Sequence, residues 1–181
     1  GLLQATFALY GDAVLFADYS EQIVDLGIGI LLATVGLSQF VTQTVIIRRV
    51  LPRFGETNLV IIGGLLRVFG MFFYAVAVSP WFGLPGSLFF AMGMGLMMPP
   101  LQSLSTRTVA DEVRGGVLGL YQSTISLATI FSTALGGVIF AVNPRYPYWT
   151  GMALSLFALI PAYYFLRRPL QKPKVESAVY K

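Results

Sequence analysis

The sequence predicts an all-α integral membrane protein with six transmembrane helices. Of its 181 residues, 56% are hydrophobic and only 11% are charged, whereas about 25% of the residues in a soluble domain are charged. Five apolar runs reach the length of about 20 residues with which a helix crosses a hydrocarbon core about 30 Å thick, and a sixth run comes close to it. Every second connection between these runs is basic.

The first three predicted spans cover residues 2–17, 26–50 and 59–78. The first run is short and is interrupted by Asp12, so we expect a truncated span that a few residues before Gly1 would complete. The sequence also begins without Met, and we expect the N-terminal part of the natural protein to be missing. The third run opens with LVIIGGLL, which is apolar on every side and therefore favours a helix over a strand of a membrane barrel.

The last three predicted spans cover residues 86–104, 117–142 and 148–166. The fourth follows an uncharged connection and ends at a small polar run before Arg107, whereas the fifth begins after a charged loop. The sixth ends before Arg167, and residues 169–181 are predicted to form a basic tail outside the membrane. Each of these runs is long enough to be a membrane-spanning helix.

The distribution of Lys and Arg predicts the orientation of the spans, because basic residues close to span ends are retained in the cytoplasm. The opposite side has Arg145 alone, and Trp81 and Trp149 with Tyr146 and Tyr148 fall at the interface on that side, which amphipathic rings prefer. Both termini are therefore predicted to be cytoplasmic. The basic residues on the cytoplasmic side are Arg48, Arg49, Arg53, Arg107, Arg114, Arg167, Arg168, Lys172, Lys174 and Lys181.

The composition excludes several kinds of chemistry. Cysteine and histidine are both absent, which removes disulfides, thiolate and imidazole metal sites, and the usual nucleophile and base pairs. We therefore expect no enzyme, no metal and no cofactor. The net charge of +4 comes from residues in the gaps between apolar runs and not from one basic surface, so we expect no nucleic-acid partner.

Residues 47–56, which read IRRVLPRFGE, connect the second and third spans with a basic cluster and a turn glycine. This connection resembles the loop signature G-x-x-x-D-R-x-G-R/K-R/K of the major facilitator superfamily, with Arg53 and Gly55 at its Arg and second Gly. Arg48 stands at the first Gly, Pro52 at the Asp and Glu56 at the following basic position, while Arg49 adds to the cluster. The gating role of that Asp is therefore not carried over. So degenerate a signature implies the C-terminal half of such a protein.

A second resemblance covers residues 97–123, which include the runs MMPPLQSLSTR, DEVRGG and LGLYQS. In drug:proton antiporters, a proline and a small polar run end the tenth helix, an Arg and an acidic pair fill a short loop, and a Gly opens the eleventh. The resemblance implies a multi-pass protein of a prokaryotic plasma (inner) membrane. It also implies a complete form of about twelve helices in two similar halves.

Two ionisable residues inside the predicted spans are functional candidates, because a charge in hydrocarbon costs several kcal/mol unless it faces protein or water. Asp12 either reaches interfacial water or serves a cavity or proton coupling. Arg67 lies nine residues into the third span, about 13 Å deep by helix rise, and is predicted to have a partner. Because the resemblance implies that this span lies on the outside of its half, a structural anchor is favoured over a substrate contact.

Uncharged polar residues are the candidates for a substrate path. Gln39 and Gln43 are four residues apart on the second span and share a helical face, and Tyr121 and Gln122 belong to a polar cluster at the start of the fifth span. The resemblance implies that the first, second, fourth and fifth spans line a central cavity. The alternative is that these side chains make ordinary hydrogen bonds between helices.

The fourth span combines Gly93, Gly95, Pro99 and Pro100. These residues either weaken and bend a gate helix or allow tight packing between helices.

Two functions remain open from the sequence. The first is solute transport by alternating access, in which this six-helix half moves against a second half from the same polypeptide, a second copy or a different chain. The second is a transport-inactive half that serves as a structural or accessory subunit of a larger membrane complex. Under both, the lipid bilayer is a partner. The small-molecule substrate of the first is unknown.

Overall fold

The computed structural model describes residues 2–107, 109 and 111–166, and the predicted tail at residues 169–181 lies outside them. Every element among the described residues is a helix, which confirms the all-α prediction. Two of the elements are single π-helical turns, marked η. In chain order the elements are α1 (Leu2–Tyr10), η1 (Gly11–Leu15), α2 (Glu21–Val41), η2 (Thr42–Ile46), α3 (Ile47–Ala75), α4 (Pro80–Thr106), α5 (Asp111–Val142) and α6 (Tyr146–Leu166).

Three helical stretches of the described chain are long and apolar enough to cross a membrane. They are Glu21–Ala75, Pro80–Thr106 and Glu112–Val142, and a shorter apolar helix covers Thr6–Leu15. The first stretch contains 55 residues, more than twice the length of about 20 residues that one crossing needs. The chain is therefore a multi-pass membrane protein, while the number of six spans stays a prediction.

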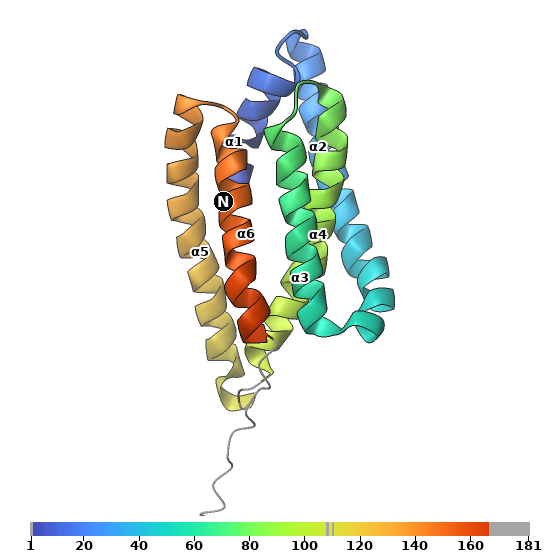
Figure 1. Cartoon of the computed structure of the whole chain (residues 1–181), viewed down its shortest axis with the longest axis vertical. Helices are drawn as coiled ribbons and strands as arrows, with labels where there is room; N and C mark the ends of the chain where they lie inside the picture. The colour runs from blue at the N-terminus through green and yellow to red at the C-terminus, as the bar shows by residue number, and fades with distance from the viewer. Residues whose placement is uncertain (1, 108, 110, 167–181) are drawn as a thin grey trace, which may run out of the picture.

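Gly55 divides the longest helical stretch into two arms. Its φ of 73° and ψ of 162° are not helical, and this backbone region is essentially restricted to glycine because a Cβ atom would clash. The chain is helical on both sides of this one residue, although the sequence suggested a longer connection between residues 50 and 59. Figure 1 shows the two arms as a hairpin, with the turn at the lower end of the molecule.

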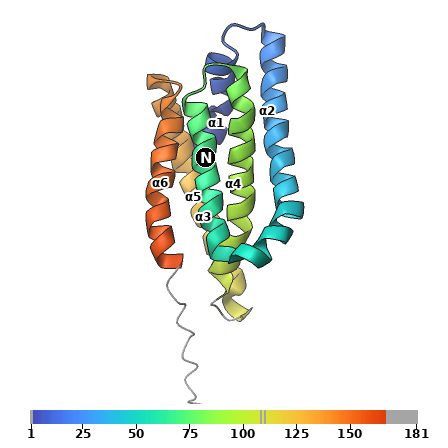
Figure 2. The same ribbon diagram turned by 45° about the vertical axis from the view of Figure 1, so that its right-hand side comes forward.

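The helices form one bundle in which α3 lies between α4 and α6. On the far side of α4 lies α2, while α5 packs against α1 and, less extensively, α4 and α6. Figure 2 shows α2 at one edge of the bundle and α6 at the other. Connections alternate between the two ends: the turn at Gly55 and the α4 to α5 connection lie at the lower end, and the α3 to α4 and α5 to α6 connections at the upper end.

Glycines bring α3 and α4 into direct backbone contact. A Cβ atom on Gly63 would lie 2.7 Å from the carbonyl oxygen of Gly93, and one on Gly93 would lie 2.6 Å from the backbone nitrogen of Arg67. Farther up, a Cβ atom on Gly70 would lie 2.5 Å from the backbone nitrogen of Phe90. Small residues that let backbones approach are typical of helix pairs in lipid. The α3 and α4 pair is therefore packed without an intervening layer of side chains at these glycines.

The outward surface is apolar. One face of α5 exposes Leu120, Phe131, Val138 and Val142, each more than 60% accessible. A soluble protein rarely exposes a continuous apolar surface of this size. The surface therefore agrees with burial of the bundle in a bilayer.

Candidate functional site

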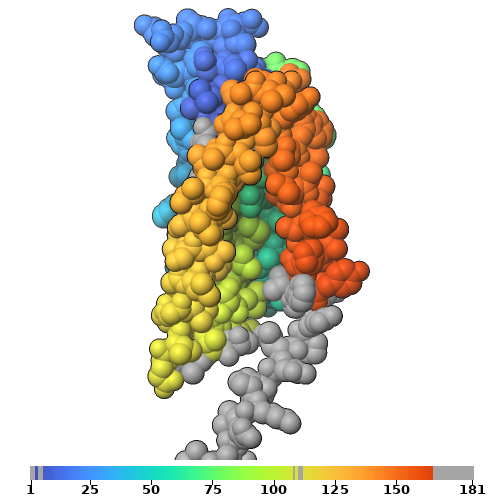
Figure 3. All heavy atoms as spheres, turned by 90° about the vertical axis from the view of Figure 1, so that its left-hand side faces the viewer, coloured from blue at the N-terminus to red at the C-terminus, as the bar shows by residue number. Residues whose placement is uncertain are grey.

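A cavity of about 910 Å³ lies inside the bundle, lined by residues of all six α-helices. Its size is within the range of about 300–1,000 Å³ that is common for small-molecule sites. Figure 3 shows a hollow between α5 and α6, with α3 and α4 visible behind it. Most of the lining is apolar, and Met71, Met94 and Met97 contribute thioether side chains from α3 and α4. Such side chains adapt to irregular shapes, because they are unbranched and polarizable.

Three buried tyrosines lie together, and two of them, Tyr74 and Tyr148, line the cavity. The ring of Tyr148 lies 4.3 Å from that of Tyr10 and 5.3 Å from that of Tyr74, and the Phe7 ring meets Tyr74 edge-on. The Tyr10 hydroxyl donates a hydrogen bond to the carbonyl oxygen of Tyr74, and the Tyr74 hydroxyl shares a hydrogen bond with Ser87. Helices α1, α3, α4 and α6 are thereby joined at one level by rings and hydroxyl groups.

Among the described residues that line the cavity, Arg67 alone is charged. Its Nε atom is buried and has no hydrogen-bond partner, and its guanidinium carbon lies 5.8 Å from the centre of the Phe90 ring. A cation over an aromatic face gains about 0.5–2 kcal/mol, which offsets only part of the cost of a charge in a membrane. Among the described residues, no carboxylate forms an ion pair with Arg67. The structure thus places this residue on the cavity and gives it an aromatic neighbour alone.

Three uncharged polar residues share the lining with Arg67. Gln39 of α2 is half-buried at the cavity wall, as are Ser132 of α5 and Ser155 of α6. The Ser155 hydroxyl lies 3.7 Å from the sulfur of Met71, and the Ser132 hydroxyl donates to the backbone of its own helix. An apolar cavity with a few polar groups is the usual form of a site for a small organic molecule.

Gln43 is absent from the cavity lining, although it was predicted to share a face with Gln39. The π-helical turn η2 begins at Thr42, between the two glutamines. A π turn inserts an extra residue and rotates all later side chains about the helix axis. Periodicity of an ideal helix could not reveal this shift.

The other predicted path residues also lie away from the cavity. Asp12 is exposed on η1, and Gln122 is exposed on α5. Tyr121 is half-buried, with its hydroxyl 3.7 Å from the sulfur of Met98. Of the five predicted path residues, the structure brings Gln39 alone to the cavity, and it adds Arg67, which had been singled out as an intramembrane charge.

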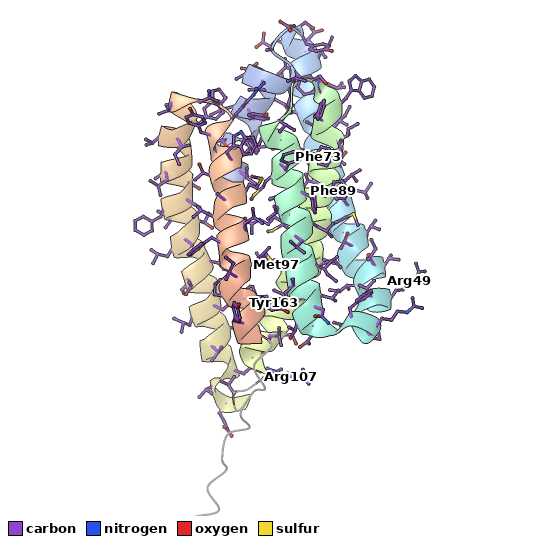
Figure 4. All side chains as sticks on the ribbon, in the orientation of Figure 1. Arg49, Phe73, Phe89, Met97, Arg107 and Tyr163 are labelled. Carbon is purple, nitrogen blue, oxygen red and sulfur yellow. The ribbon has the colours of Figure 1, made fainter. Side chains whose placement is uncertain are left out.

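At the turn around Gly55, the basic cluster is exposed. Arg48, Arg49 and Arg53 are all exposed, and Figure 4 shows Arg49 directed away from the bundle. The sequence analysis missed the role of Glu56, which accepts a hydrogen bond of 2.7 Å from the Ser103 hydroxyl and pairs with Arg107 at 3.5 Å. These contacts join the part of α3 that follows Gly55 to the end of α4. A residue that replaces the family's basic position therefore has its own structural partners.

The four residues singled out on the fourth span lie within the continuous helix α4. Gly93 and Gly95 are buried, and a Cβ atom on Gly95 would lie 2.9 Å from the side chain of Thr42. Pro99 and Pro100 remove two backbone donors from the same helix. The glycines thus serve close packing in this structure, while bending of α4 stays a prediction.

No group of three or more potential metal-ligating side chains is present in the described part of the chain.

Comparison with known proteins identifies one matching family and several relatives. A model of the Major Facilitator Superfamily matches residues 2–179. The chain is 28% identical over 127 residues to the "Multidrug resistance protein MdtH" of Photorhabdus laumondii, with 69% of the chain and 32% of that protein covered. It is 29% identical over 126 residues to the "Tetracycline resistance protein, class C" of Escherichia coli, with 70% and 31% covered.

A third relative covers more of the chain. The "Tetracycline resistance protein, class H" of Pasteurella multocida is 26% identical over 170 residues, which are 91% of the chain and 42% of that protein. The chain therefore spans less than half the length of the curated relatives it matches.

Proposed function

The chain belongs to the Major Facilitator Superfamily, and from this membership we propose that it forms half of a secondary transporter that exports drug-like small molecules by alternating access. Its six helices act as one rigid half, and a second six-helix half completes the substrate path near the middle of the bilayer. The names of the relatives, which concern multidrug and tetracycline resistance, support export as the direction and drug-like molecules as the substrates.

An exposed polar face on α5 is the observation that supports a second half. Gln122, Ser126 and Thr133 are exposed and lie on one side of the helix, because they are separated by four and seven residues. Gly115, Gly119 and Gly137 continue the same face, and a Cβ atom on any of them would meet nothing within 4 Å. The opposite face carries the large apolar residues that suit lipid.

Polar groups that face hydrocarbon are unfavourable, whereas small and polar residues are common where membrane helices pack. The polar face of α5 therefore suits a neighbouring protein helix. A similar strip of small residues, Gly29, Ala33 and Gly36, is exposed on α2. We place the second half against these two helices.

An efflux assay in bacteria tests the proposal, with tetracycline and a fluorescent dye as substrates and the complete polypeptide as the exporter. Ser126→Trp puts a bulky ring on the polar face of α5 and is expected to abolish efflux, while the protein still inserts into the membrane. Leu120→Trp, on the lipid face of the same helix, is the matched control and should leave efflux unchanged. Parental efflux by Ser126→Trp would contradict docking at this face. Stable co-purification with an unrelated membrane complex, without efflux, would favour the accessory-subunit function.

A further inference from the structure

The charge of the cavity lining is one-sided. Arg67 brings a permanent positive charge into the cavity, and the described residues of the lining include no Asp or Glu. Its buried Nε atom has no hydrogen-bond partner among the described residues, and its guanidinium group lies over the ring of Phe90. A guanidinium group has five N–H donors in a planar fork, which matches the two oxygens of a carboxylate. An anionic group in the cavity would satisfy both the charge and these donors.

The other residues of the lining indicate which kind of molecular body such an anion has besides its acidic group. Leu32 and Val35 of α2, Met94 and Met97 of α4, and Leu154 and Leu159 of α6 form apolar walls. The rings of Phe7, Tyr74 and Tyr148 also line the cavity. Apolar and aromatic surfaces of this kind favour a large hydrophobic or aromatic body. The volume of about 910 Å³ is sufficient for a drug-sized molecule.

The cavity is also reached from the side of the bundle. Figure 3 shows the hollow between α5 and α6 at the surface of the molecule, and both helices expose apolar side chains, such as Phe131 and Phe157. A molecule with an apolar body partitions into the bilayer and arrives at this opening from within the hydrocarbon. Ser132 and Ser155 line the cavity from α5 and α6, the two helices that flank the opening.

We propose that this cavity binds amphipathic organic anions, with the acidic group on Arg67 and the apolar body between α4, α6 and the tyrosines. The inference rests on the proposed export function, since it names the substrate class of the same molecule. A soluble organic acid and an anionic lipid share this chemistry, so the experiment has a separate arm for each source.

Protection of a single cysteine from a membrane-permeable maleimide measures occupancy. The chain contains no cysteine, so Ser155→Cys creates one reactive site on the cavity wall. The protein is placed in nanodiscs of neutral phosphatidylcholine, and three pyrene probes of similar size are compared: pyrenebutyrate, its uncharged methyl ester and the corresponding amine. Pyrenebutyrate is expected to protect about ten- to a hundredfold better than the other two, the range given by one or two charge-assisted hydrogen bonds. Equal protection by all three probes, or none by pyrenebutyrate, would overturn the proposal.

Substitutions of Arg67 assign the preference to this residue. Arg67→Gln is expected to remove the advantage of the anion over the ester, and Arg67→Lys to retain part of it, because an ammonium group keeps the charge but not the fork. Arg49→Gln, at the exposed turn, is the matched control and should keep the full advantage. Met97→Trp, which fills the cavity and keeps Arg67, should weaken binding of the anion and the ester together. An anion preference that survives Arg67→Gln would overturn the assignment.

The lipid arm uses nanodiscs of anionic phosphatidylglycerol without any probe. Slow labelling of Ser155→Cys that becomes fast in the Arg67→Gln variant identifies a lipid as the anion and supports the inference. Slow labelling in neutral lipid without a probe means that the cavity is closed to ligands and overturns it. None of these measurements requires transport, so an inactive exporter that still shows the Arg67-dependent preference would sink the export function and leave the site standing. Unchanged efflux of anionic substrates by the Arg67→Gln variant would overturn the anion site and leave the export function standing.

Discussion

At the scale of single residues, buried hydroxyl groups join helices beside the cavity. Tyr74 is 2% exposed, and its hydroxyl group pairs with that of Ser87, which is fully buried. The same tyrosine also accepts a hydrogen bond from Tyr10 through its backbone carbonyl group. Because hydrogen bonds satisfy polar groups that cannot reach water, each of these contacts contributes to the stability of the folded state.

We predict that Tyr74→Phe lowers the stability of the protein in detergent by about 1 kcal/mol, the usual magnitude for one hydrogen bond between membrane helices. The substitution keeps the ring contacts and the bond from Tyr10, and it leaves the Ser87 hydroxyl without its partner. Thermal unfolding followed by gel filtration measures the change. Tyr164→Phe, at a position 67% exposed, is the control. Equal melting temperatures for both variants would show that the pair with Ser87 adds nothing.

At the scale of elements, the sequence predicts helices well and their details poorly. Apolar runs of about 20 residues have few alternatives to a helix in lipid, because every backbone donor and acceptor must be satisfied internally. Local departures from a regular helix leave no comparable pattern in the sequence. The π turn at Thr42 separates Gln39 from Gln43, and Gly55 replaces a whole loop with one residue. Glu56 looked like a departure from a signature, and its pairing with Ser103 depends on a residue 47 positions away.

The packing of α3 on α4 leads to a prediction for two glycines. Gly63→Ala and Gly93→Ala each place a methyl group within 3 Å of the facing backbone, so both should destabilise the bundle by about 1–3 kcal/mol. Gly116→Ala on α5 is the control, because a Cβ atom there meets nothing within 4 Å. Its stability should be equal or higher, since Ala favours a helix over Gly. The same heating assay checks all three, and an unchanged melting temperature for Gly93→Ala would contradict the backbone contact.

At the scale of the whole molecule, the two ends of the bundle differ in charge. Arg49 and Arg107 lie at the lower end in Figure 4, where the two basic connections are found. Arg145 lies at the opposite end, where it donates a hydrogen bond of 3.1 Å to the carbonyl oxygen of Ala77. The alternation of loop charge could be predicted from the sequence because it is local. The walls of the cavity could not, because they come from all six α-helices, which include α3 and α6 besides the four spans that the resemblance implied.

We predict that the lower end faces the cytoplasm, as the excess of basic residues indicates. In intact bacteria, a membrane-impermeable maleimide should label Asn143→Cys but not Arg49→Cys. After the cells are broken open, both variants should be labelled. The natural absence of cysteine makes each variant a single-site probe. Labelling of Arg49→Cys in intact cells would reverse the orientation.

The glycine contact between α3 and α4 has a mechanical consequence. Most helix pairs are separated by a layer of side chains whose rotamers allow one helix to slide past the other by small steps. At Gly63 and Gly93 that layer is missing, and the backbones themselves bear on each other. If one helix slid along the other, carbonyl oxygens would clash with Cα atoms. We therefore expect α3 and α4 to move as one rigid unit. A displacement of α3 along its axis is then expected to move α4 with it.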